Sequence, residues 1–169
     1  MKKLNQLLVE LEARIPEFEI TNSKVSNSTV GWQIEHSLKT ILEIVRFVKK
    51  SNPKEYHWKF NFNKTLVATI GFIPRGKAKA PKVVVPDENI SEASLKNSLQ
   101  NVKTALQEWN SFDKNAHFPH PYFGKLNKKS TVWFLNLHTK HHLKIINDIC
   151  RNEIAYNSNS LYIKLQTIQ

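Results

Sequence analysis

Two histidines that lie four residues apart, His138 and His142, are the residues of this sequence whose type and spacing most directly suggest chemistry. They belong to the segment WFLNLHTKHHLKII, residues 133–146, in which helical spacing puts both side chains on the apolar side. Their Cβ atoms would then be about 5–6 Å apart. A buried imidazole without a partner costs roughly 1–3 kcal/mol, so each ring needs a carbonyl, a carboxylate or a metal ion. The pair alone is equally consistent with two hydrogen-bonded core histidines and with metal binding.

A metal site would need a third ligand from elsewhere in the chain. Two imidazoles at this separation can bind one zinc-like ion, with each nitrogen about 2.0–2.1 Å from the metal. His36 is the best candidate for the third ligand because it lies in another long apolar helical repeat, and His120 and His117 rank behind it. Periodicity puts His36 on the flank of that apolar stripe and does not establish that it is buried. Three protein ligands would leave a position for a metal-bound water or thiol, so no side chain is assigned as catalytic.

Other residues near these histidines have weaker claims on such a site. His141 would be an outer contact, an alternative ligand, or a residue that simply packs beside Leu137. Trp32, one helical turn before His36, would be either a wall of the pocket or an ordinary core or groove aromatic. Glu35 points away from His36 on a helix and is interpreted as a solvent-facing charge. The single cysteine, Cys150, excludes an internal disulfide and a cysteine-rich zinc finger.

The elements that must position these histidines are predicted to be helices. Apolar residues recur at helical spacing over about residues 4–15, 30–50, 64–72, 87–109 and 128–153. Ser28 is expected to cap the second of these helices, Asp87 or Ser91 the fourth, and Asn127 the last. Residues 113–124 read as a turn-rich connection, and residues 77–86 as extended chain on the surface. The pattern predicts an all-α four-helix bundle with long connecting loops over residues 1–155. A C-terminal tail, residues 156–169, would follow, either as part of the same domain or as a short extended segment.

The composition indicates one domain with a marked positive charge. The chain has 169 residues, of which 40% are hydrophobic, and a formal net charge of +11. Its lysines are scattered along the sequence, so we interpret the charge mainly as a solubility feature rather than a nucleic-acid footprint. No run approaches the ~18 apolar residues of a membrane span, and the first residues lack the apolar core of a signal peptide. We therefore expect a cytoplasmic protein without a membrane partner.

Three segments, taken in order, resemble landmarks of the DinB-like metal-binding superfamily: GWQIEHSLKTILEIVR, HPYFGKLNKKS and LHTKHHLKII. They are most similar to an uncharacterised branch, a domain of unknown function with an HP-aromatic-FG-x-L loop and an HxxHH helix. The resemblance covers most of residues 1–150. It implies a four-helix bundle in which three histidines hold a divalent ion, often nickel or zinc, and the matching residues here are His36, His138 and His142.

The resemblance also implies a class of chemistry. Better characterised relatives include thiol-dependent S-transferases and a maleylpyruvate isomerase, in which the metal would activate a low-molecular-weight thiol. The expected protein is thus a metal-dependent thiol transferase or hydrolase with a small-molecule substrate, and a homodimer is one conceivable assembly. A non-catalytic metal-binding or basic nucleic-acid-binding bundle is the alternative. Relatives often carry Gln three positions after the last ligand, where this chain has Ile145, so a polar contact to the metal site is expected to be missing.

Overall fold

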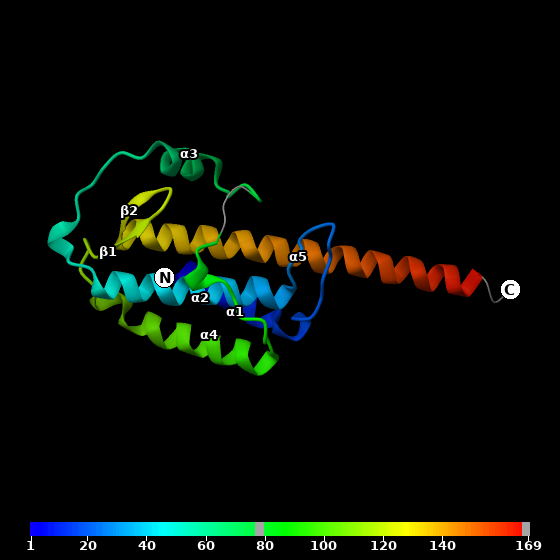
Figure 1. Ribbon diagram of the computed structural model, residues 1–169. Helices are drawn as coiled ribbons and strands as arrows, with labels where there is room; N and C mark the ends of the chain where they lie inside the picture. The colour runs from blue at the N-terminus through cyan, green and yellow to red at the C-terminus, as the bar shows by residue number, and fades with distance from the viewer. Residues whose placement is uncertain (77–79, 167–169) are drawn as a thin grey trace.

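The chain folds into five α-helices and one two-stranded antiparallel sheet over the residues that the computed structural model describes, 1–76 and 80–166 (Figure 1). Side chains are described for residues 1–76 and 80–151. The helices are α1 (Lys2–Ala13), α2 (Val30–Lys50), α3 (Phe62–Ile70), α4 (Glu92–Gln107) and α5 (Lys128–Gln166). The strands are β1 (His117–His120) and β2 (Gly124–Asn127), and a short 3-10 helix, η3, spans Lys82–Val84.

The predicted fold class, an all-α four-helix bundle, is wrong. The segment interpreted as a turn-rich connection forms a hairpin in which His117 pairs with Asn127 and His120 with Gly124. Gly124 has φ 69°, a backbone conformation that glycine adopts without steric cost. A fifth helix, α3, lies on the surface of the packed helices and has no buried residue. The described chain is therefore a mixed structure of helices and a small sheet.

The prediction of an extended tail is also wrong for the residues that the structure describes. Residues 156–166 continue α5, which runs past the ends of the other helices (Figure 1). The sequence from residue 154 to 166 contains neither glycine nor proline, so nothing in it interrupts the helix. Despite the 39 residues of α5, no helix in the described part of the chain is both long and apolar enough to cross a bilayer.

The core lies where α2 packs against α4 and α5, and where α1 packs against α5. Each of these helices contributes fully buried aliphatic side chains, including Leu4, Leu11, Ile34, Leu38, Leu95, Leu135 and Ile146. The predicted bounds of the second helix, 30–50, are confirmed, although Thr29 caps it in place of Ser28: the Trp32 amide donates to Thr29 Oγ1 over 3.0 Å. Ser91 and Asn127 cap α4 and α5 as predicted. These contacts bring one face of α2 against one face of α5, about a hundred residues away in the sequence.

Candidate metal centre

His36 of α2 and His138 and His142 of α5 form one cluster between the two helices. One ligand nitrogen from each ring lies within 4.8 Å of the other two, so the cluster could hold a metal ion. The ring centroids are 5.2 Å (His36 and His138), 4.7 Å (His36 and His142) and 4.5 Å (His138 and His142) apart. The Nε2 atoms of His138 and His142 are 3.2 Å apart. Two nitrogens bound tetrahedrally to one zinc-like ion would be about 3.3 Å apart, given bonds of about 2.0–2.1 Å.

Two of the three imidazoles are held in the orientation that metal binding requires. His36 Nδ1 lies 2.9 Å from the carbonyl oxygen of Val84, and His142 Nδ1 lies 2.6 Å from Gln33 Oε1. Both partners are acceptors, so both Nδ1 atoms carry the proton, and the lone pairs are on the Nε2 atoms. Histidines that bind metals usually donate their other N–H to such an oxygen, which fixes the tautomer and the ring. The donor set therefore fits a divalent ion with a preference for nitrogen.

His138 differs from the other two histidines in the hydrogen bonding of its Nδ1 atom. The residue is partly exposed, but its Nδ1 atom is buried and has no hydrogen-bond partner among the described residues. Its Nε2 faces His142 Nε2. Because His142 Nδ1 already donates to Gln33, His142 Nε2 can only accept or coordinate. Either a proton from His138 or a cation must therefore lie between these two nitrogens.

The electrostatics of the cluster keep all three rings neutral near neutral pH. Burial lowers the pKa of His36, and it lowers the pKa values of His138 and His142 well below the ordinary value of 6.5. A positive charge on any neighbouring ring lowers the pKa values of His138 and His142 further. A neutral imidazole is the form that binds a metal, so binding would not have to displace protons from these rings.

Gln33 is a residue of this site that sequence reasoning missed. It is 3% exposed, and its side-chain amide reaches both His142 and Ser26, with Nε2 3.2 Å from Ser26 Oγ. The resemblance directed attention to position 145, where Ile145 is indeed buried and apolar. The polar contact comes from α2 instead. The available signal was that Gln33 precedes His36 by three residues and so lies one turn away on the same side of the helix.

Aromatic rings line two sides of the cluster. Trp32 stacks on His36 with ring centroids 5.0 Å apart and an interplanar angle of 15°, so it covers one face of that ring. Phe134 lies 5.5 Å from His138. His141 meets His142 edge-on at 5.1 Å, but it is not one of the three clustered residues. These rings would shield part of a bound ion from water.

His120 and His117 belong to the hairpin and not to the cluster. His120 Nδ1 accepts hydrogen bonds from the backbone amides of Tyr122 and Phe123, both over 3.1 Å, and its ring stacks on Phe123. His117 Nδ1 lies 3.1 Å from the carbonyl oxygen of Asn115. His120 thus stabilises the hairpin turn and His117 the turn before β1, and neither is one of the three clustered residues.

The hairpin histidine gives a pH-dependent prediction. Burial lowers the pKa of His120 from 6.5 to about 4, and a proton on Nδ1 would also face two N–H donors. The unfolded chain binds this proton below pH 6.5 and the folded chain only below about pH 4, so stability falls as the pH drops through that window. The Oδ1 atom of Asn in the variant His120→Asn can accept the same hydrogen bonds but does not titrate. We expect this variant to lose about 2 kcal/mol less unfolding free energy over this pH window, a figure lowered to allow for solvent screening of the partly exposed ring.

The measurement is urea unfolding of both proteins at pH 7.0 and pH 4.5 with chelator present. The other histidines then contribute equally to the pH dependence of both proteins, so their contribution cancels when the two losses of unfolding free energy are compared. Equal losses of unfolding free energy in the two proteins would contradict the assignment of His120 as a neutral acceptor in the turn.

Glu35 is not the solvent-facing charge that its sequence position suggested. It is 9% exposed, because α4 packs against this flank of α2 and Ser98 Oγ donates to Glu35 Oε1 over 3.0 Å. Its other oxygen, Oε2, is buried without a partner among the described residues. Burial raises the pKa of this carboxyl. Glu35 lines a cavity of about 160 Å³ beside Lys39 and Ser98 and is not one of the clustered metal-binding residues.

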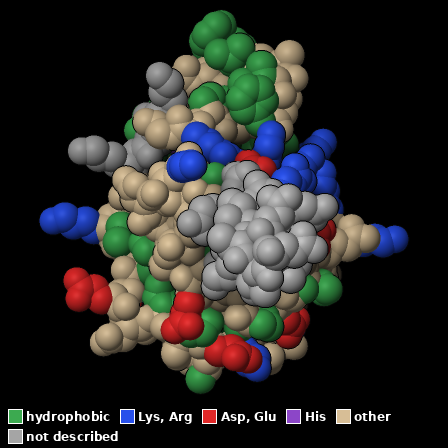
Figure 2. All heavy atoms as spheres, turned by 90° about the vertical axis from the view of Figure 1, so that its right-hand side faces the viewer, with side chains coloured by type: hydrophobic (Ala, Val, Ile, Leu, Met, Phe, Trp, Pro, Cys, Tyr) green, Lys and Arg blue, Asp and Glu red, His purple; other side chains and the backbone are tan. Residues whose placement is uncertain are grey.

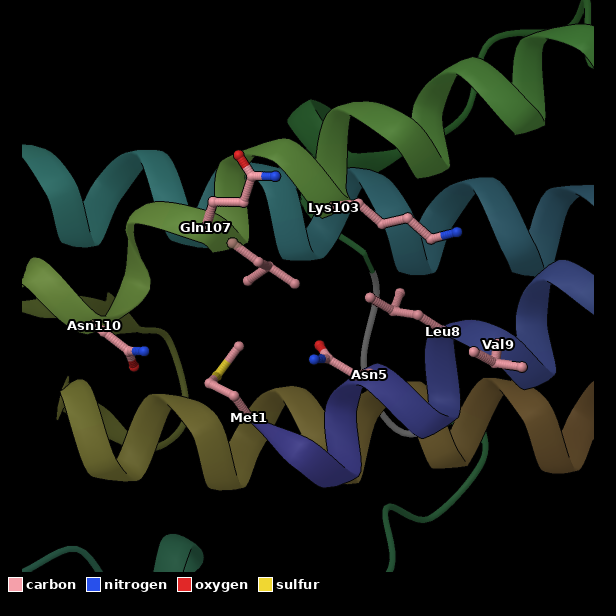
Figure 3. A pocket seen from close by; sticks show the side chains of 8 residues that line it. Met1, Asn5, Leu8, Val9, Lys103, Gln107 and Asn110 are labelled. Carbon is pink, nitrogen blue, oxygen red and sulfur yellow. The ribbon is translucent and has the colours of Figure 1, made fainter.

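A larger concavity lies away from the histidines. It has a volume of about 430 Å³ and is formed by α1 and α4 (Figure 3). Its lining residues are Met1, Asn5, Leu8, Val9, Lys103, Leu106, Gln107 and Asn110. None of these side chains belongs to the cluster, and the one ionisable side chain among them, that of Lys103, is paired with Glu12. The candidate chemistry is therefore at the helix interface and not in this groove.

Comparison with known proteins gives one family match. A family described as "Protein of unknown function (DUF1569)" matches residues 67–148, slightly less than half of the chain. The matched stretch includes His138 and His142 and begins after His36. No curated protein and no solved structure matches the chain. The match indicates similarity to an uncharacterised family; it names no activity and does not confirm the DinB-like resemblance.

Proposed function

We propose that this chain is a metal-dependent enzyme of the DinB-like type, in which His36, His138 and His142 hold one divalent ion, nickel or zinc. The observation that carries the proposal is the convergence of three neutral imidazoles from two helices. Two of them are already oriented through Nδ1. A divalent ion bound there would supply Lewis-acid activation of a water or of a low-molecular-weight thiol. The reaction class we propose is thiol transfer or hydrolysis on a small-molecule substrate.

The residues around the cluster support chemistry rather than a closed structural site. Structural zinc sites in proteins have four protein ligands, whereas three leave a position for a reactant. Within the described part of the chain, this cluster contains three residues that could bind the ion. Trp32 and Phe134 flank two of them and would exclude part of the bulk water, which strengthens electrostatic interactions in the site. The protein's part is to fix the three ligands and to shape the space beside them.

The test is elemental analysis of protein purified without chelator, followed by reconstitution with cobalt or nickel. We expect about one divalent ion per chain, and a melting temperature about 8–16 °C above that of the chelated protein when free metal is ~1,000-fold above Kd. Cysteine or glutathione should then add a sulfur-to-metal absorption band in the near ultraviolet. Absence of both bound metal and metal-dependent stabilisation would refute the metal site. Metal binding without any response to thiols would refute the thiol chemistry alone.

A further inference from the structure

The segment around α3 presents six large apolar side chains to solvent. Their exposed fractions are 70% for Trp58, 67% for Phe60, 68% for Phe62, 47% for Leu66, 40% for Ile70 and 57% for Phe72. We call these six residues the α3 face. Phe62, Leu66 and Ile70 follow one another at four-residue spacing, so they form one stripe along the outer side of the helix.

The α3 face is held outward by contacts on the opposite side of the segment. Val67 and Ile73 are partly buried and pack against the core. Asn61 Nδ2 donates to the carbonyl oxygen of Tyr122 over 3.2 Å, and Lys64 Nζ donates to Ser130 Oγ over 3.0 Å. One side of the segment therefore packs against the rest of the protein, and the opposite, apolar side is exposed to solvent. Turning the apolar stripe inward would break the packing contacts.

The exposed apolar area is at or above the upper end of what a typical monomer surface carries in one patch. An aromatic side chain buries about 150–250 Å², so four aromatics exposed by 57–70% present roughly 400–650 Å², before Leu66 and Ile70 are added. The largest apolar patch of a typical monomer is about 300–600 Å² and is often functional. A binding partner that covers the α3 face is the physical expectation.

The charge around this segment indicates what kind of partner it is. Residues 56–86 contain six lysines and arginines and no acidic residue. Lys59, just before α3, and Lys82, in η3, are exposed, whereas Arg75 is paired with Asp148. Figure 2 shows hydrophobic side chains gathered at the top of the molecule, the side on which α3 lies in Figure 1, with Lys and Arg side chains just beneath them. An apolar stripe beside basic residues is the pattern of segments that lie in the interface of anionic bilayers.

We propose that the α3 face docks onto an anionic phospholipid surface, with its aromatic and aliphatic side chains among the lipids and the basic residues at the headgroups. This departs from the expectation that the chain has no membrane partner, while no part of it requires a spanning helix. A second copy of the chain would bring two basic surfaces of the same sign together, which is unfavourable. Single-stranded nucleic acid would use the aromatics for stacking but would leave Leu66 and Ile70 unexplained.

The experiment is co-sedimentation of the full chain with vesicles of phosphatidylcholine and phosphatidylglycerol at 3:1, and with pure phosphatidylcholine vesicles, in 0.1 M salt. We expect binding to the anionic vesicles only, at least fivefold weaker in 0.5 M salt. Phe60→Ser with Phe62→Ser should weaken it at least tenfold. Phe47→Ser is the matched control, because Phe47 is a 51% exposed aromatic on α2 outside the α3 face. Circular dichroism would verify that the variants fold.

Three outcomes would overturn the proposal. The first is no binding to anionic vesicles. The second is equal binding by the double variant and the control. The third is a wild-type dimer in light scattering that the double variant converts to a monomer without any vesicle binding, which would identify a second copy as the occupant. None of these results depends on the metal centre, so the proposal can fail while the proposed function stands.

Discussion

Replacing His142 by alanine is expected to lower the affinity for a divalent ion by more than about 100-fold, since even the loss of an outer partner of a ligand costs 10–100-fold. His142 is 7% exposed, and its Nε2 faces His138 while its Nδ1 is held by Gln33. Its removal takes away one of three ligands and leaves Gln33 Oε1 without its donor. The measurement is competition for metal with a coloured chelator at pH 7.5, together with the metal-dependent shift in melting temperature.

The matched control for this variant is His141→Ala. His141 is the neighbouring residue in the sequence, and its ring touches His142 edge-on, but it is outside the cluster. We expect the control to retain its metal affinity within about threefold of the unmodified protein. This margin allows for the small effect of losing a neighbour that is not a ligand. If both variants lost affinity equally, or if neither did, the assignment of His142 as a ligand would be wrong.

Gln33→Leu is expected to weaken metal binding by about 10–100-fold without removing any ligand. Leucine has similar bulk but cannot accept the proton of His142 Nδ1, so the ring would lose the bond that fixes its tautomer and orientation. Gln33→Glu keeps an acceptor at this position and should bind metal at least ten times more tightly than Gln33→Leu. Cobalt spectra of the two variants would report ligand number at saturating metal, and we expect three protein ligands in both.

A purely structural role of Gln33 predicts a different pattern. The leucine variant would then lose stability in the presence of chelator while keeping its metal affinity. Urea unfolding of the chelated proteins separates these cases, because our interpretation places most of the effect in the metal-bound state.

Features that depend on local spacing could be predicted from the sequence. The second helix was predicted from 30 to 50, as observed, because its apolar residues recur without interruption and Pro53 lies beyond its end. The i, i+4 geometry of His138 and His142 also follows from one helix alone. The hairpin did not follow, because its four-residue strands are too short for alternation to be distinguished from a loop and β1 contains a proline.

Which flanks of α2 are buried depends on how the helices pack together, and the sequence did not predict it. Periodicity measures a side chain's direction relative to its own helix, but burial depends on which neighbours pack there. With α5 on one flank and α4 on another, His36 and Glu35 are both buried although neither lies at the centre of the apolar stripe. The same packing brings Gln33 to His142, 109 residues away, and so supplies the polar partner that position 145 lacks. Contacts of this kind arise between helices, so the pattern within α2 places Gln33 near His36 but does not show that it meets His142.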